Sequence, residues 1–98
     1  MAKDAGKQIV GTVCVVLPRV LVNLFPGSAT EVDVNAGTVR EMMAALDARW
    51  PGMRDRLCDS RPAIRRHINV FVDGRHATLD TRLEPGTEVY VLTAMSGG

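Results

Sequence analysis

Hydrophobic side chains recur at every second position in several short stretches of the chain, a period that predicts β-strands. Residues 30–34 (T-E-V-D-V) alternate between polar and apolar side chains, as a strand with one buried face does. Residues 9–17 (I-V-G-T-V-C-V-V-L) become apolar at successive positions, which is typical of a central strand covered on both faces. Residues 68–72 (I-N-V-F-V) and 88–92 (E-V-Y-V-L) predict two further strands.

Turn residues separate these stretches. Asp73-Gly74 predicts a tight hairpin that leads into a short return strand over residues 75–79 (R-H-A-T-L). Glu84-Pro85-Gly86-Thr87 predicts a second turn, placed directly before the last strand. Residues 30–34 can pair antiparallel with residues 9–17.

Between residues 38 and 49 the hydrophobic period lengthens to that of a helix. Thr38 followed by Glu41 matches a capping box, and Pro51-Gly52 ends the pattern. We expect one apolar stripe of this helix to be buried against the sheet, with Leu46 and Trp50 in its core. The stripe consists of Val39, Met42, Met43, Leu46 and Trp50.

The remaining segments have no long period. Residues 19–27 (R-V-L-V-N-L-F-P-G) are apolar but bounded by prolines, so we expect a loop or an irregular edge. Met53 and Leu57 predict a short second turn of helix before a polar, Arg-rich connection over residues 59–66. The element order predicts an α+β fold, a mixed sheet of four or five strands with one main helix across one face.

A single main helix leaves the other face of the sheet to water or to a partner. If the valines of residues 68–72 and 88–92 point toward the helix, then Phe71, Tyr90 and Leu92 point away from it. We therefore predict that Phe71, Tyr90 and Leu92 form a partner-docking surface. The alternative is that a loop or the N-terminal segment covers this face.

The charge of the chain limits the choice of partner. Twelve Lys and Arg residues balance eleven Asp and Glu residues, and the formal net charge is +1. This balance predicts neither nucleic acid nor a membrane as a main partner. Arg61, Arg65 and Arg66, with His67 beside them, form a local basic cluster that is either a solvated loop or a docking patch.

The two cysteines, Cys14 and Cys58, do not form a C-x-x-C motif, and their spacing to His67 and His76 does not suit a metal site. We expect Cys14 to be a buried small hydrophobe and Cys58 to be exposed, without a nearby base that would make it a catalytic thiol. Two unmatched thiols are typical of a reducing cytoplasm, where we expect the protein to lie.

The strand order ends in the residues T-A-M-S-G-G, and the whole pattern resembles the ThiS/MoaD family of ubiquitin-like sulfur carriers, which have the β-grasp fold. The polar residues 1–8 predict a disordered tail, and the resemblance implies a β-grasp domain over residues 9–93 and a flexible Gly-Gly tail over residues 94–98. The long connection R-L-C-D-S-R-P-A-I-R-R is most similar to carriers that supply sulfur for cysteine synthesis. The matching stretches are V-C-V-V-L-P, T-V-R-E-M-M-A-A-L, H-I-N-V-F-V-D-G-R, L-E-P-G-T-E-V-Y-V-L and T-A-M-S-G-G.

This resemblance implies a chemical role for Gly98 and for Ser96 and Gly97 before it. A ubiquitin-activating-like adenylyltransferase would use ATP to adenylate Gly98, and a sulfur donor would convert the adenylate to a thiocarboxylate. A terminal carboxylate, whose pKa is about 3.5, is ionised at neutral pH and a poor electrophile, so the adenylate supplies the leaving group. Glycine gives the tail a slim backbone that fits a narrow active site.

The resemblance implies that the chain is a protein co-substrate and not an enzyme, with no bound cofactor or metal. A downstream biosynthetic enzyme of the cysteine, thiamin or molybdopterin type would take the sulfur. Three alternatives stay open. The chain could be a protein modifier conjugated through Gly98, the small subunit of a molybdopterin synthase, or an interaction domain in which the glycines are incidental.

Overall fold

The computed structural model describes residues 11–60 and 63–93 of the chain. The tails predicted over residues 1–8 and 94–98 lie outside the described residues, as does Arg61 of the basic cluster. Predictions that concern those positions stay predictions.

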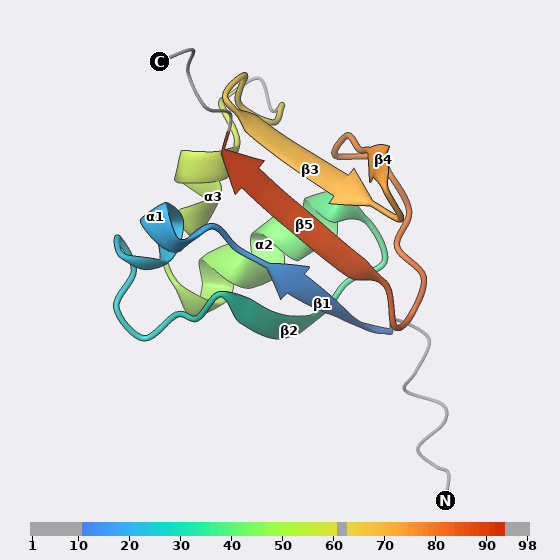
Figure 1. Ribbon diagram of the computed structural model, residues 1–98, viewed down its shortest axis with the longest axis horizontal. Helices are drawn as coiled ribbons and strands as arrows, with labels where there is room; N and C mark the ends of the chain where they lie inside the picture. The colour runs from blue at the N-terminus through green and yellow to red at the C-terminus, as the bar shows by residue number, and fades with distance from the viewer. Residues whose placement is uncertain (1–10, 61–62, 94–98) are drawn as a thin grey trace, which may run out of the picture.

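Five strands form one sheet in the order β2-β1-β5-β3-β4 (Figure 1). The central strands β1 and β5 run parallel, and the remaining neighbours pair antiparallel, which confirms the predicted mixed sheet and the antiparallel pairing of the first two strands. The strands are β1 (Thr12–Val16), β2 (Glu31–Asn35), β3 (Ile68–Val72), β4 (Arg75–His76) and β5 (Glu88–Thr93).

The hairpin between β3 and β4 has the predicted two-residue turn. Asp73 and Gly74 adopt φ values of 53° and 79°, and positive φ at both positions matches the right-handed twist of the flanking strands. The return strand is shorter than predicted because the backbone turns away at Thr78. The amide of Thr78 donates to the hydroxyl of Thr81 at 3.0 Å, and the amide of Thr81 donates to the carbonyl of Thr78 at 3.1 Å.

The main helix, α2 (Val39–Arg49), begins at the predicted cap. The hydroxyl of Thr38 accepts a hydrogen bond from the amide of Glu41 at 3.1 Å. The carboxylate of Glu41 accepts from the amide of Gly37 at 2.7 Å, one residue before the position that a standard capping box uses. The first bond satisfies an amide that the first turn of a helix leaves without an intrahelical partner, and the second ties the residue before the cap to that turn.

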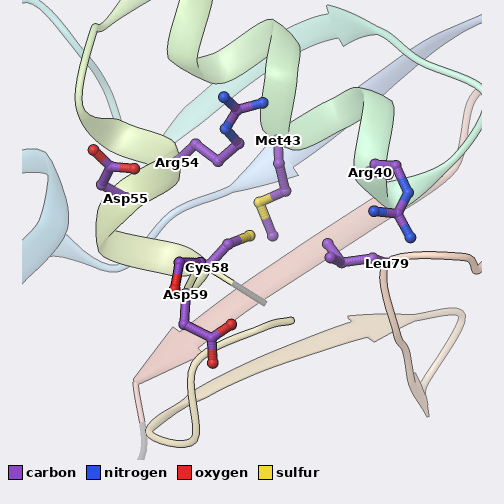
Figure 2. Close-up of a pocket in the computed structure, with 8 residues that line it drawn as sticks. Arg40, Met43, Arg54, Asp55, Cys58, Asp59 and Leu79 are labelled. Atoms are coloured by element: carbon purple, nitrogen blue, oxygen red, sulfur yellow. The ribbon is translucent and has the colours of Figure 1, made fainter. Parts of the chain in front are cut away.

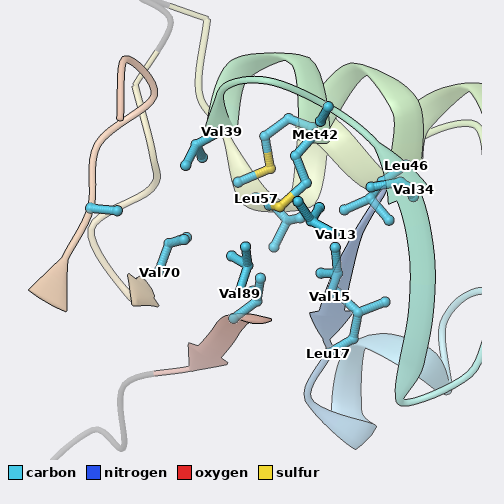
Figure 3. Packing of buried hydrophobic residues seen from close by; sticks show 14 of the residues in the cluster. Val13, Val15, Leu17, Val34, Val39, Met42, Leu46, Leu57, Val70 and Val89 are labelled. Atoms are coloured by element: carbon cyan, nitrogen blue, oxygen red, sulfur yellow. The ribbon is translucent and has the colours of Figure 1, made fainter. Parts of the chain in front are cut away.

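Helix α2 lies across one face of the sheet and closes the core there (Figures 1 and 3). Its residues Val39, Met42, Met43 and Leu46 are at most 1% exposed. From the sheet, the inward valines are fully buried, and they are Val13, Val15, Val70, Val89 and Val91. The apolar stripe is thus confirmed for these helix residues.

Trp50 departs from the prediction that it is buried with Leu46. Its side chain is only partly buried, and the guanidinium of Arg49 lies 4.6 Å from the centre of its ring. Trp50 is the residue at which α2 ends, with φ at −133°, so its side chain no longer follows the helical stripe.

Residues 19–27, expected to be a loop or an irregular edge, contain a helix of one turn, α1 (Arg19–Val22). The carbonyl of Pro18 accepts hydrogen bonds from the amides of Leu21 and Val22 at 3.0 and 3.1 Å. Proline suits this position because a helix start needs its carbonyl but not its missing amide hydrogen. The second short helix, α3 (Met53–Leu57), was predicted, and both of its terminal side chains are fully buried.

Candidate functional site

The face of the sheet opposite α2, here called the open face, carries the residues that the strand parity predicted. Tyr90 and Leu92 on β5 are 42% and 43% exposed. Phe71 on β3 and Val16 on β1 are the register partners of Tyr90 on its two sides, and both are partly buried. The predicted orientation is confirmed, whereas the docking role of these residues stays a prediction.

Phe71 is less exposed than Tyr90 and Leu92 because a residue of β4 covers one edge of its ring. The ring of His76 packs edge-on against Phe71, with centroids 5.4 Å apart and planes at 75°. Nε2 of His76 lies 3.0 Å from Oδ1 of Asn69, which fixes the imidazole over the sheet. Phe71 therefore supports the floor of the open face, and Tyr90 and Leu92 project from it.

Acidic side chains border the open face on the side of β2. Cys14 on β1 has Asp33 of β2 and Glu88 of β5 as its register partners. Desolvation and the nearby carboxylates of Asp33, Glu31 and Glu88 raise the pKa of the Cys14 thiol. Cys14 is partly exposed, so the expectation that it is buried was wrong, because it alternates with the inward-facing Val13 and Val15.

Tyr90 is hydrogen-bonded to Glu88, one of the acidic residues at this border. Its hydroxyl donates to Oε1 of Glu88 at 3.2 Å, and this hydrogen bond, with the charge of the carboxylate, raises the pKa of Tyr90. The open face therefore combines an apolar centre with hydrogen-bonding and acidic groups at one border. Surfaces of this composition, with an exposed aromatic at the centre, are typical of protein interfaces.

Ser96, Gly97 and Gly98 lie outside the described residues, and the structure describes the chain up to Thr93 at the end of β5. Leu92 of the open face directly precedes that end. In Figure 1, the end of β5 lies on the same side of the molecule as α1 and α3. Leu92 therefore lies at the end of the sheet that is nearest in sequence to Gly98.

A family model, the ThiS family, matches residues 15–98. The chain belongs to the ThiS family. The match begins at Val15 near the end of β1, spans the rest of the described β-grasp domain and includes Ser96, Gly97 and Gly98. The predicted family is thereby confirmed, and with it the ubiquitin-like class of sulfur carriers and protein modifiers.

Solved structures of this class share the fold. CysO in its complex with BexX from Amycolatopsis orientalis is 27% identical with a TM-score of 0.79, covering 88% of this chain and 99% of that one. SAMP1 from Haloferax volcanii is 25% identical with a TM-score of 0.76, over 90% and 100% of the two chains. CysO from Mycobacterium tuberculosis is 25% identical with a TM-score of 0.76, over 85% and 99%. A search among curated protein sequences found no match.

These similarities confirm the β-grasp fold of this ThiS-family chain. Small carriers of the ThiS/MoaD type are generally not enzymes. Within residues 11–60 and 63–93, no three His, Cys, Asp or Glu side chains lie together as ligands of a metal ion. None of the helices in the same residues has the length and apolar character needed to span a bilayer.

The second cysteine lines a pocket of about 370 Å³ beside α2 and α3 (Figure 2). Cys58 is only 7% exposed, which contradicts the expectation of an exposed thiol, and its sulfur points toward Met43 (Figure 2). Backbone hydrogen bonds fold the following connection back over it, from Asp59 to Ala63 at 2.8 Å and from Arg65 to Leu57 at 2.8 Å. Burial raises the pKa of Cys58, so its thiol stays protonated and unsuited to nucleophilic attack.

The basic cluster is only partly a free surface. Nε of Arg65 donates to the backbone carbonyl of Asp55 at 2.8 Å and so holds the connection against α3. Arg66 and His67 are exposed. Two further exposed apolar residues, Val20 and Leu24, were not predicted, because residues 19–27 were expected to form a loop or an irregular edge. Their spacing of four positions was the available signal of a shared helical side.

Proposed function

We propose that this chain is a sulfur carrier whose C-terminal Gly98 is adenylated and then converted to a thiocarboxylate. The observation that carries the proposal is the family match, which runs through Ser96, Gly97 and Gly98. The similarity to two CysO proteins supports the cysteine-type subgroup as the pathway. In this role the chain is a substrate of partner enzymes, and ATP is bound by the adenylyltransferase.

The chemistry needs two displacement steps at the carboxylate of Gly98. A carboxylate oxygen attacks the α-phosphorus of ATP, a P–O bond breaks, and pyrophosphate leaves. Hydrosulfide from a sulfur donor then attacks the carbonyl carbon and a C–S bond forms. The C–O bond to AMP breaks, and AMP leaves with the oxygen that had linked it to this carbon. The remaining proton passes to solvent, and the thiocarboxylate stays attached to the carrier as a soft nucleophile.

The open face would position this tail by docking the adenylyltransferase through Phe71, Tyr90 and Leu92. Tyr90 and Leu92 project from the sheet and are already exposed, so removing their side chains leaves the core unchanged. The double variant Tyr90→Ala/Leu92→Ala should therefore raise the KM for the carrier about tenfold or more, as loss of a central apolar contact does at interfaces.

The experiment measures ATP–pyrophosphate exchange with the ubiquitin-activating-like enzyme of the same organism, over a range of carrier concentrations. Ala44→Ser, at an exposed position of α2 on the far side of the sheet, is the control. Phe71→Ala/Leu92→Ala tests the third predicted residue, Phe71, with the melting temperature as a check because Phe71 also packs on His76. Unchanged exchange kinetics in both double variants would remove the open face from the mechanism.

A protein modifier is the second candidate, and the similarity to SAMP1 favours it. Both functions begin with the same adenylate, so exchange kinetics do not separate them. Covalent adducts of the chain with lysines of other proteins in its own cells would favour the modifier. Free carrier that transfers its sulfur to a purified cysteine-, thiazole- or molybdopterin-forming enzyme would favour the carrier and identify the pathway.

A further inference from the structure

The short helix α1 and the residue after it present two apolar side chains to solvent. Val20 is 57% exposed and Leu24 is 49% exposed, more than any other large hydrophobic residue that the structure describes. They line a groove of about 190 Å³, here called the α1 groove, which Leu21 also lines from the side of the core. The other residues at the groove are Arg56, His67, Ile68 and Thr93.

The α1 groove lies at the end of β5, where residues 94–98 begin. Thr93 is the last residue of β5, pairs with Ile68 of β3, and lies on the helix side of the sheet. Leu92, one residue earlier, lies on the open face and is 43% exposed. The described end of β5 therefore lies between two apolar surfaces, and a protein that receives Gly98, five residues after Thr93, must approach this end of the sheet.

The border of the groove is basic. Arg56 and His67 are both exposed there, and Arg65 lies beside them in an adjoining depression with Asp55 as the one carboxylate. A surface with this excess of positive groups is complementary to acidic side chains of a partner. The volume of the groove is below the range of small-molecule sites and suits a single inserted side chain.

We propose that the α1 groove is a second docking site for the adenylyltransferase, which inserts an apolar side chain flanked by acidic residues. This inference rests on the proposed function, since it assumes that the enzyme receives Gly98. The enzyme then holds the end of β5 from both sides, with Tyr90 and Leu92 on the open face and Val20 and Leu24 in the groove. Contacts on both sides fix the direction in which residues 94–98 leave the sheet.

The test compares Val20→Ser/Leu24→Ser with the wild-type chain in ATP–pyrophosphate exchange with the ubiquitin-activating-like enzyme of the same organism. Asn23→Ser, an exposed change in the same segment outside the groove, is the matched control. We expect the double variant to raise the KM for the carrier about tenfold, the loss typical of an interface anchor, without changing kcat or the melting temperature. Arg56→Glu should raise KM more at low salt than at high salt, because salt screens the repulsion between the new carboxylate and the acidic residues of the enzyme.

The outcomes separate the two proposals. If the wild-type chain is not adenylated, the proposed function fails. If it is adenylated and the double variant and Arg56→Glu keep the wild-type KM, the α1 groove is not a docking site and the proposed function stands. If sedimentation shows a wild-type dimer that Val20→Ser/Leu24→Ser dissociates, the groove binds a second copy and the inference is overturned.

Discussion

The two thiols differ in their surroundings at the residue scale, and both surroundings disfavour the thiolate. Cys58 is enclosed beside Met43, and burial is the main cause of its raised pKa. Cys14 is partly exposed, and the carboxylates that face it from β2 and β5 add to desolvation. At neutral pH neither thiol would therefore compete with the proposed thiocarboxylate of Gly98 as the reactive sulfur.

The carboxylate of Asp33 should control the reactivity of Cys14. In a Cys58→Ala background, Asp33→Asn removes a negative charge opposite Cys14, which stabilises the thiolate and lowers the pKa of Cys14. The midpoint of the pH profile for alkylation by iodoacetamide should shift to lower pH. Asp73→Asn in the distant hairpin is the control, and a midpoint that moves equally in both variants would show that Asp33 has no specific effect.

Leu46 should contribute strongly to stability, because its side chain is completely buried between α2 and the sheet. Leu46→Ala removes this packing and should lower the free energy of unfolding by about 2–5 kcal/mol. The same substitution at the exposed Leu92 is the matched control and should cost much less. Denaturant unfolding of both variants provides the measurement, and equal losses would place Leu46 outside the core.

At the element scale, β1 and the turn before β5 approach so closely that only glycine fits between them. A Cβ added to Gly11 would lie 2.2 Å from Cβ of Pro85 and 2.5 Å from its Cα, where backbone must shift. The amide of Gly86 donates to the carbonyl of Thr12 at 2.8 Å and holds the same contact. The turn before β5 is thus held against the start of β1 by close packing and by this hydrogen bond.

Gly11→Ala should separate this turn from β1 and lower the free energy of unfolding by about 1–3 kcal/mol, the usual cost of overpacking. Gly37→Ala is the control, because the nearest atom to its new Cβ, at 3.2 Å, is the carboxylate oxygen at the end of the exposed Glu41 side chain, which can move by the small distance needed. Thermal and denaturant unfolding measure the difference. A smaller loss for Gly11→Ala than for Gly37→Ala would contradict the close packing.

The elements with a strong hydrophobic period or a specific turn could be predicted from the sequence. The α2 stripe, the Asp73-Gly74 hairpin and the outward direction of Tyr90 and Leu92 follow from local pattern. The environments of Cys14 and Cys58 could not be predicted, because they depend on which strand face meets the helix and on a connection that folds back over α3. Helix α1 was missed because one turn of helix gives a single spacing of four positions, from Val20 to Leu24, which is too little to establish a helical period.

At the scale of the whole molecule, the last strand of the described domain reaches Thr93 beside two apolar surfaces, and the proposed chemistry lies further along the chain at Gly98. The open face and the α1 groove would orient the domain on its partner, while the residues after Thr93 would reach the active site. Gly97→Ala adds a Cβ where the enzyme's tunnel should be narrow. It should slow adenylation without moving the melting temperature, and a normal exchange rate in this variant would contradict a narrow tunnel.

The most direct test of the sulfur-carrier proposal is the intact mass of the chain after incubation with the ubiquitin-activating-like enzyme of the same organism, ATP and sulfide. The proposal predicts a gain equal to the difference between one sulfur and one oxygen atom, located at Gly98 by fragmentation. Deleting Gly98, or adding one Ala after it, should abolish the gain while the fold is kept. A gain of the same size in both altered chains would contradict the account, because the sulfur would then not depend on the carboxylate of Gly98.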